Sequence, residues 1–336
     1  MKKFFGKVKK WFVDHKPTRR RIIQVYTALL YNANIKGFFN GQIYKGQTKK
    51  MCVPGLNCYS CPGAVGACPL GSLQNALSAS DTRLPAYIFG IIVLFGLLLG
   101  RTICGFLCPV GFAQEMLYKI KSPKLQKSKA TYVLSYLKYA ILIGLVVVVP
   151  LVFAIPGFCE YICPAGTFEG GVGLLSNIKN ETLLAILGPL FSWKFSLLVL
   201  ICVASVFIFR VFCRFLCPLG AIYGLFSKLA VLGVKLDKTK CTDCGLCISA
   251  CKMDIKKVGD HECIQCGECI SVCPTKAISW KGAKLFVRAN ETDAPAPQNV
   301  KPLMGMLKKT PPVSETKQEN EQPTANVEQT TEVRDD

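Results

Sequence analysis

The chain has 336 residues, of which 51% are hydrophobic and 18% are charged, and it contains 19 cysteines. A hydrophobic fraction this high excludes a chain that is disordered throughout, and the length excludes a small domain held together only by disulfides. The 41 Lys and Arg against 21 Asp and Glu give a formal charge of +20, which by composition alone is typical of proteins that bind nucleic acid or an anionic membrane. The positions of the basic residues decide between these two classes.

Four apolar stretches without charged residues predict about four membrane-spanning helices. In chain order they are 22–35, 84–100, 139–159 and 195–209. The third is 21 residues long, which is enough to cross a hydrocarbon core of about 30 Å. The fourth has 15 residues and is expected to extend at both ends. The first has the alternative of lying in the membrane interface.

The basic residues flank these stretches, as the positive-inside rule expects of a membrane protein. Nine Lys and Arg lie in the first 21 residues and six lie in 101–130, whereas 160–193 contains one. This distribution predicts that the N-terminus, the 101–130 loop and everything after Arg210 are cytoplasmic, and that 36–83 and 160–193 face outward. We therefore expect a multi-pass protein of the cell (inner) membrane, in contact with the lipid bilayer and without a nucleic acid partner.

A nine-residue motif occurs twice, 109 residues apart. Residues 101–109 (RTICGFLCP) and 210–218 (RVFCRFLCP) both fit R-x-x-C-x-F-L-C-P. Each copy is predicted at the cytoplasmic end of a span that runs inward, so an axis along the membrane normal would bring the two copies face to face. Four thiolates are what a [4Fe–4S] cluster needs. The repeat therefore predicts a cluster at the inner membrane face, held by Cys104, Cys108, Cys213 and Cys217.

Two further cysteine runs, 241–251 and 263–274, have the spacing C-x2-C-x2-C-x3-C of two-cluster bacterial ferredoxins. In those proteins the fourth Cys of each run binds the other cluster. One predicted cluster is therefore held by Cys241, Cys244, Cys247 and Cys273, and the other by Cys263, Cys266, Cys269 and Cys251. We expect Gly245 and Gly267 where the chain wraps closely around sulfide, and Lys252 stands where a Pro usually follows the run. Zinc is the alternative metal for C-x2-C pairs.

Six more cysteines lie in the segments predicted to face outward. They are Cys52, Cys58, Cys61 and Cys68 in one loop, and Cys159 and Cys163 in a third C-x3-C-P motif. One interpretation is an outer cluster held by Cys159, Cys163, Cys61 and Cys68, since a Pro follows both Cys61 and Cys68. The alternatives are a cluster held by the four loop cysteines alone, which include Cys52 and Cys58, and a structural disulfide. Cys202, alone in the fourth apolar stretch, is expected to pack as a small apolar residue.

On these motifs the chain resembles the membrane polyferredoxins of the NapH/NosR type, which are associated with periplasmic nitrate reductase and nitrous oxide reductase systems. The resemblance rests on Cys104/Cys108, Cys213/Cys217 and the eight ferredoxin cysteines, and covers roughly residues 20–285. It implies a small helical membrane domain joined to a two-cluster ferredoxin. It also implies electron transfer across or along the membrane, often toward an extracytoplasmic flavin or metal protein.

The expected fold class is an α-helical integral membrane domain with an internal parallel repeat, followed by a small α+β ferredoxin domain and a disordered tail. The predicted parts are a basic N-terminus at 1–21, the membrane domain at 22–232, the ferredoxin domain at 233–288 and the tail at 289–336. The tail is rich in Pro, Glu, Gln and Thr, a composition typical of disordered segments.

The predicted function is one-electron transfer through a series of [4Fe–4S] clusters. The donor would be a cytoplasmic ferredoxin or a quinol, and the acceptor would lie at the outer face. The sequence contains no nucleotide-binding motif and no nucleophile–base arrangement, so no catalytic residue is assigned. The chain would then serve as the electron-transfer component of an oxidoreductase system. The alternatives are a membrane redox sensor or maturation factor, and a quinol-oxidising subunit of a reductase complex.

Overall fold

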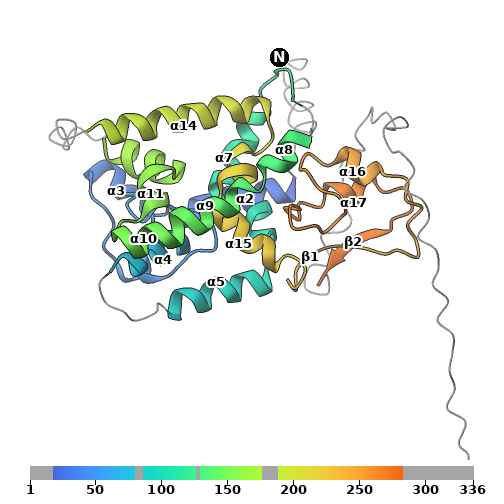
Figure 1. Ribbon diagram of the computed structural model, residues 1–336, viewed down its shortest axis with the longest axis horizontal. Coiled ribbons are helices and arrows are strands. Elements are labelled where there is room, and N and C mark those ends of the chain that lie inside the picture. Colours follow the sequence, from blue (N-terminus) through green and yellow to red (C-terminus); the bar gives the residue numbers. More distant parts are fainter. Residues whose placement is uncertain (1–17, 80–85, 126–128, 176–187, 283–336) are drawn as a thin grey trace, which may run out of the picture. The chain divides into compact units, whose positions relative to one another are not determined.

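The computed structural model describes most of the chain (Figure 1). The described ranges are 18–79, 86–125, 129–175 and 188–282. The predicted tail at 289–336 and most of the predicted basic N-terminus, up to residue 17, lie outside the described residues. All described residues belong to one unit of the chain, Met1–Lys301.

The described residues up to 226 form helices joined by loops (Figure 1). The first helices are α2 (Arg19–Tyr31), α3 (Ile35–Asn40), η1 (Gln47–Lys50), α4 (Pro69–Ser78), α5 (Ala86–Leu98), α6 (Thr102–Phe106) and α7 (Pro109–Tyr118). They are followed by α8 (Lys129–Leu134), α9 (Leu137–Ile141), η2 (Leu142–Val148), α10 (Val149–Phe153), α11 (Gly157–Tyr161), η3 (Gly166–Val172) and α12 (Gly173–Leu175). The last are α14 (Pro189–Phe207), η5 (Phe212–Leu216) and α15 (Pro218–Phe226). Here η2, η3 and η5 are π-helical turns.

Two helices in the described ranges are long and apolar enough to cross a membrane. One is Ala130–Phe153, which runs from α8 to α10 through a turn at residues 135–136, and the other is α14. Their mean hydropathies are 2.3 and 2.1. Only 22% and 11% of the residues in the most apolar 18-residue segment of each helix are buried. The other two predicted spans are shorter as helices, because α5 and α2 each have 13 residues. The prediction of about four spans therefore has the support of two full-length helices.

Backbone conformation ends the first long helix earlier than hydropathy predicts. Ala154 has a φ of 53° and closes α10, and Pro156 follows two residues later. The predicted span 139–159 therefore stops at Phe153, and Cys159 lies on the separate helix α11. This break turns the chain so that the third C-x3-C-P motif begins on a short helix of its own.

The second long helix extends beyond the predicted stretch 195–209 at one end only. It begins six residues earlier, at Pro189, and it ends at Phe207 because Ile208 is extended, with φ −116° and ψ 131°. Arg210 then has a φ of 53°. The expected extension at both ends was therefore wrong at the C-terminal end.

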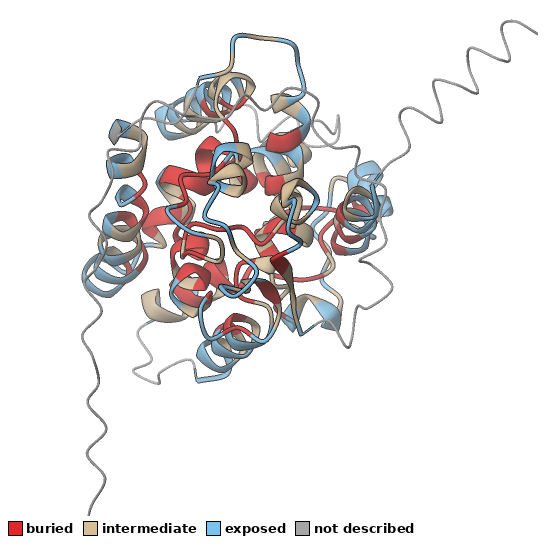
Figure 2. Cartoon of the chain, turned by 90° about the vertical axis from the view of Figure 1, so that its right-hand side faces the viewer, coloured by how far each residue is buried: buried red, intermediate tan, exposed pale blue. Residues whose placement is uncertain are grey.

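The buried residues lie mainly toward the middle of the molecule (Figure 2). The core that they form contains many of the cysteines. Its cysteines are Cys68, Cys108, Cys163, Cys213 and Cys217, with Cys104 and Cys159 packed against them. Phe158 and Phe212, both fully buried, lie in the same core with their ring centroids 6.3 Å apart. The motif cysteines are thus part of the packing that holds the helices together.

The segment after Gly233 folds as a small α+β module. Strand β1 (Gly233–Leu236) pairs antiparallel with β2 (Ile278–Lys281), in the register Val234 to Trp280. Between the strands lie the short helices α16 (Leu246–Ala250) and α17 (Glu268–Val272), which pack against each other. This is the arrangement that the sequence predicts for residues 233–288, of which the structure describes those up to 282.

Gly245 and Gly267 precede α16 and α17 in left-handed conformations, with φ values of 72° and 79°. A Cβ on Gly267 would approach the Trp280 ring to 2.5 Å, whereas a Cβ on Gly245 would meet nothing within 4 Å. Protein atoms therefore leave no room for a side chain at Gly267, and the expected close wrapping around sulfide stays a prediction for both glycines. At Gly245 the reason for glycine is the positive φ.

Two buried carboxylates join distant parts of this unit by ion pairs. Glu115 on α7, 2% exposed, pairs with Arg20, Arg21 and Arg210. Glu262 in the ferredoxin module, 1% exposed, pairs with two buried cations, Arg101 and Lys138. Removing one partner of a buried pair leaves an uncompensated charge in a medium of low dielectric constant, and the cost is far larger than for an exposed pair.

We predict that Glu115→Ala lowers the free energy of unfolding by about 3–5 kcal/mol, because Arg210 is left buried without its carboxylate. Denaturant titration of the purified protein measures the change. The control is Glu268→Ala, whose side chain is 42% exposed and pairs with Lys252 and Arg20, and whose loss should cost about 0–1 kcal/mol. Equal losses in the two variants would contradict a special role for the buried charge.

Candidate iron–sulfur sites

The two copies of the R-x-x-C-x-F-L-C-P motif face each other, and their four cysteines form one group, the inner site. Cys217 lies close enough to Cys213, Cys104 and Cys108 for a negative charge on any of these sulfurs to act on its thiol. Cys108, Cys213 and Cys217 are all at least 90% buried. The structure therefore brings together the four thiols of the predicted inner cluster, and their role as ligands stays a prediction.

The arginine that opens each copy of the motif reaches across to the other copy. Arg101 donates two hydrogen bonds to the carbonyl oxygen of Gly220, at 3.0 and 2.9 Å. Arg210 donates to the carbonyl oxygen of Cys104. Its guanidinium packs against Gly111, where an added Cβ would lie only 3.1 Å from it. This reciprocal contact places two buried cations beside the thiols of the inner site.

A glutamine on α7 holds the inner site from the side. Cys108 is the N-cap of α7, with Pro109 as the first helical residue. Six residues after Cys108, Gln114 donates from Nε2 to the Sγ of Cys213, at 3.2 Å, and accepts from the backbone N–H of Phe212, at 2.9 Å. One side chain thus fixes both a sulfur and the backbone before it.

On α15, Cys217 has the same capping position as Cys108 on α7. It is the N-cap, and Pro218 is the first helical residue. The backbone N–H of Gly220 donates a hydrogen bond to the Sγ of Cys217 at 3.4 Å. Helix N-terminal amides of this kind favour a negatively charged sulfur.

The cysteines that the sequence predicts to face outward include a second group, the outer site, whose members differ from the set predicted first. Cys58, Cys68, Cys159 and Cys163 line one cavity of about 280 Å³, and Cys163 lies within electrostatic range of the other three. Cys61 instead donates from Sγ to Asn32 Oδ1 at 3.6 Å, and Cys52 donates to Ser72 Oγ at 3.8 Å. Cys58, kept only as an alternative ligand, thus lies where the sequence analysis expected Cys61.

None of the cysteines forms a disulfide in the structure, in which all 19 lie in described ranges. Burial raises the pKa of Cys58 to about 11 and that of Cys68 to about 12. Thiols with raised pKa values are poor nucleophiles, whereas coordination to a metal deprotonates a thiol outright. The raised pKa values therefore keep these two thiols protonated and weakly nucleophilic at neutral pH.

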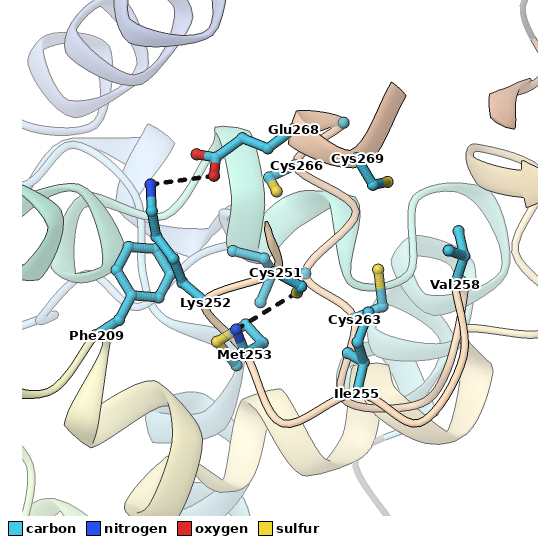
Figure 3. Close-up of a pocket in the computed structure, with 12 residues that line it drawn as sticks. Phe209, Cys251, Lys252, Met253, Ile255, Val258, Cys263, Cys266, Glu268 and Cys269 are labelled. Atoms are coloured by element: carbon cyan, nitrogen blue, oxygen red, sulfur yellow. Dashed lines mark hydrogen bonds and ion pairs between the residues drawn. The ribbon is translucent and has the colours of Figure 1, made fainter. Parts of the chain in front are cut away.

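In the ferredoxin module, Cys251, Cys263, Cys266 and Cys269 line a single cavity (Figure 3). These are the four ligands predicted for one cluster from the exchange of the fourth cysteine. Lys252, at the position of the missing Pro, donates from Nζ to Glu268 Oε2 at 3.1 Å beside this cavity. The backbone N–H of Met253 donates to the Sγ of Cys251 at 3.4 Å.

The other four ferredoxin cysteines belong to the remaining predicted cluster. Cys247 lies within electrostatic range of Cys244 and Cys241. Cys273 ends α17 and has its Sγ 3.6 Å from the hydroxyl oxygen of Thr275. The assignment of Cys273 to this cluster stays a prediction.

The inner site and the ferredoxin cavity are in direct contact. Cys104 packs against an apolar cluster that includes Phe209, Cys263 and Ile264. The contact is close at the next residue, since a Cβ on Gly105 would lie 2.5 Å from the carbonyl oxygen of Ile264 and 3.8 Å from the Cα of Cys266. Glycine at 105 therefore lets the two cysteine groups approach each other.

The side chains that hold the thiols in place were missed by the sequence analysis, although a signal for them exists. The pattern C-P-x-G occurs four times, beginning at Cys68, Cys108, Cys163 and Cys217. The residue six positions after each Cys is Gln74, Gln114, Glu169 or Tyr223. All four of these side chains make hydrogen bonds to backbone groups in other motifs or loops. A search centred on C-x3-C-P stops short of this position.

Comparison with known protein families finds 4Fe-4S binding domains in four stretches between residues 84 and 279. A model described as a 4Fe-4S binding domain matches three stretches, 84–128, 138–180 and 190–238, and a second model of the same description matches 258–279. The first three stretches contain the C-x3-C-P motifs, and the fourth contains Cys263 to Cys273. The loop with Cys58 and Cys68 precedes all four. Among described residues, no group of three or more His, Cys, Asp or Glu side chains is arranged to hold a single metal ion.

The chain is similar to several curated proteins over about half of its length. An uncharacterized protein of Methanocaldococcus jannaschii is 35% identical over 49% of the chain and 64% of its own length. The methylamine utilization ferredoxin-type protein MauN of Paracoccus denitrificans is 27% identical over 53% of the chain and 58% of its own length. YccM of Escherichia coli, provisionally named as an electron transport protein, is 25% identical over 54% of the chain and 48% of its own length. No solved structure matches.

Taken together, the matches define a protein that carries 4Fe-4S domains of the ferredoxin type and has relatives named for ferredoxin-type electron transport. The matched part spans less than two thirds of the length of each of these relatives. The finer resemblance to the NapH/NosR type stays a prediction.

We predict that Gly105→Val loosens the contact between the inner site and the ferredoxin module, because its side chain would meet the Ile264 backbone. Overpacking of this kind costs about 1–3 kcal/mol, so amide hydrogen exchange around Cys263 to Cys266 should speed up by roughly tenfold or more. The control is Gly90→Val on α5, where an added Cβ meets nothing within 4 Å. Unchanged exchange in Gly105→Val would contradict the contact.

Proposed function

We propose that this protein is a membrane-bound electron carrier whose cysteine groups hold a series of [4Fe–4S] clusters. The ferredoxin module would hold two, on the ligands that the sequence predicts, and the inner site would hold a third. Each cluster, when bound, supplies the capacity to accept and release one electron. The proposal rests on the matches to 4Fe-4S binding domains and on relatives with electron-transport names.

The side chains of the inner site fit such a cluster. Its four thiols lie together, three of them at least 90% buried, and a cluster bound by four thiolates carries net negative charge, which a buried site must balance. Arg101 and Arg210 belong to ion-pair groups that contain more cations than carboxylates. These groups are Arg101 and Lys138 with Glu262, and Arg20, Arg21 and Arg210 with Glu115. The net positive charge that remains would balance a cluster. Gln114 donates to a sulfur, and hydrogen bonds to the sulfurs are one of the means by which a protein sets a cluster's potential.

The single observation that carries the proposal is the contact between the inner site and the ferredoxin cavity. Cys104 packs into the apolar cluster that contains Cys263, and Gly105 touches the backbone next to Cys266. Electron transfer between bound centres becomes faster as the centres approach each other. Apolar side chains and Gly105 make up much of this contact. Arg20 adds a polar link, because it donates to the carbonyl oxygen of Gly105 at 3.0 Å and pairs with Glu268 of the ferredoxin module.

The membrane location and the partners belong to the same proposal. Two long helices expose apolar side chains such as Ile143, Leu151 and Leu200, each at least 60% exposed, and such a surface suits lipid. With the distribution of Lys and Arg, this favours a multi-pass protein with a cytoplasmic ferredoxin module. The donor would be a reduced ferredoxin or a quinol, and the acceptor a flavin or metal protein at the outer face.

We predict that Cys213→Ser removes the inner cluster and leaves the ferredoxin pair intact. In anaerobically purified protein the iron content should fall by about four atoms per chain, with the interacting signals of the ferredoxin clusters unchanged in electron paramagnetic resonance spectra. Cys202→Ser, in α14, is the matched control, because that thiol is half-buried and lies apart from the other cysteines in sequence. Iron content that stays at the wild-type level in Cys213→Ser would show that the inner site holds no cluster.

A second prediction tests conduction itself. Vesicles without quinone that contain the protein and trapped ferricyanide should lose their oxidant faster when dithionite is added outside than protein-free vesicles do. Vesicles with Cys213→Ser should behave like the protein-free ones, because the inner site is the link between the ferredoxin module and the rest of the chain. If the wild-type protein with its full iron content gave no faster reaction than lipid alone, conduction across the membrane would be wrong.

A further inference from the structure

We propose that the outer site is a second copy of the inner site and binds a fourth [4Fe–4S] cluster. Its ligands are Cys58, Cys68, Cys159 and Cys163. The proposal deepens the proposed function, since it adds a site on the side opposite the ferredoxin module. Two of its cysteines, Cys58 and Cys68, lie before the first stretch that matches a 4Fe-4S binding domain.

The two sites correspond residue by residue along one half of each. Four positions of the outer site correspond to positions of the inner site at a constant offset of 54, and three of them carry the same residue. The pairs are Phe158 and Phe212, Cys159 and Cys213, Cys163 and Cys217, and Glu169 and Tyr223. The backbone N–H of Gly166 donates to the Sγ of Cys163 at 3.4 Å, as that of Gly220 does to Cys217 at the same distance. Sequence and local geometry therefore repeat together.

The other half of each site has its own correspondence, at an offset of 40 positions. Cys68 is the N-cap of α4 and Pro69 its first residue, as Cys108 and Pro109 are for α7. Gln74 donates from Nε2 to the Sγ of Cys159, at 3.3 Å, and accepts from the N–H of Phe158, at 2.9 Å. These contacts repeat those of Gln114 in the inner site within 0.1 Å.

The correspondence stops at the fourth ligand, because the offset of 40 positions places Ala64 where the inner site has Cys104. The contacts of the loop favour Cys58 instead. The N–H of Cys58 donates to Glu169 Oε2 at 2.7 Å, which fixes the loop against the C-P-x-G helix that begins after Cys163. A Cβ on Gly170 would lie 3.2 Å from the Cys58 sulfur, so the lack of a side chain there lets the loop approach. Cys58 thus completes the outer site as Cys104 completes the inner one.

The outer site has the room and the charge that a cluster requires. Its cavity of about 280 Å³ is many times the roughly 10–15 Å³ that admits one water molecule, so it can hold a group much larger than a single ion. Lys194 on α14 lines the cavity and donates from Nζ to the carbonyl oxygen of Cys159 at 3.3 Å. Lys194 is therefore placed to balance thiolate charge at the outer site, as Arg101 and Arg210 are at the inner site.

Buried aromatic side chains connect the two sites. The Phe158 and Phe212 rings, one next to each C-x3-C motif, lie 6.3 Å apart. Tyr223, which is fully buried, lies within electrostatic range of Cys68 in the outer site and of Cys104 and Cys108 in the inner site. The sites therefore share one dry core, and no solvent layer separates them.

The experiment compares Cys58→Ser with Cys61→Ser in the full chain, purified without oxygen. The wild-type protein should contain about sixteen iron atoms per chain, and Cys58→Ser about twelve. Cys61→Ser, three residues away in the same loop, should keep the wild-type content, because its thiol faces Asn32. Loss of iron in Cys61→Ser but not in Cys58→Ser would overturn the ligand assignment, and a wild-type content of about twelve would overturn the outer cluster.

A milder pair of variants keeps the test decisive if Cys58→Ser fails to fold. Gln74→Leu removes a hydrogen bond to a sulfur of the outer site only, and Gln114→Leu does the same at the inner site. Since hydrogen bonds to sulfur favour the reduced cluster, each variant should lower the midpoint potential of a different single signal in a redox titration. If both variants moved the same signal, or Gln74→Leu moved none, the outer cluster would be wrong.

The results also separate this proposal from the proposed function. If the outer cluster does not exist, Cys213→Ser still removes one cluster and leaves the ferredoxin pair. If the inner site holds no cluster, Cys213→Ser changes nothing, whatever Cys58→Ser does. Each outcome therefore assigns the failure to one site.

Discussion

The burial of cysteine sulfurs in groups of four is the constraint on which the arrangement of this protein depends. In the proposed clusters, four thiolates in one dry space would repel one another and lack hydration, so each would need a nearby donor or cation. The chain meets this need with helices that begin Cys-Pro, because Cys at the N-cap points its sulfur at free backbone amides such as that of Gly220. Gln114 and Gln74 add side-chain donors. Three of the helices around the core, α4, α7 and α15, begin at such a Cys-Pro step.

Much of this could be predicted from the sequence, because ligand spacing is a local property. The C-x2-C-x2-C-x3-C runs predict which cysteines share a cavity, and Cys251 does lie with Cys263, Cys266 and Cys269. The R-x-x-C-x-F-L-C-P repeat predicts that its two copies meet, since similar segments at similar positions form similar surfaces. The structure brings those four thiols together and adds the exchange of Arg101 and Arg210 between the copies.

Other features depend on contacts that a single sequence does not display. The long helices end where Ala154 and Arg210 adopt positive φ values, and neither residue type predicts that conformation. The choice between Cys58 and Cys61 depends on the folding of their loop. A following Pro pointed to Cys61, but the N–H of Cys58 is held by Glu169, which lies 111 residues away. Such long-range hydrogen bonds decide the site and leave no local signature.

The matching contacts of Gln74 and Gln114 explain why the cysteine groups lie close together. The C-x3-C motifs that begin at Cys159 and Cys213 are each held by a glutamine from a helix whose N-cap is a cysteine of the same group. Phe158 and Phe212, one beside each of these motifs, pack together with ring centroids 6.3 Å apart. The shared core then brings the inner site against the outer one, while Gly105 brings it against the ferredoxin module. The inner site is therefore the one group in contact with both others. A change in its packing would be felt on both sides, whereas a change at the outer site would leave the ferredoxin contact unaltered.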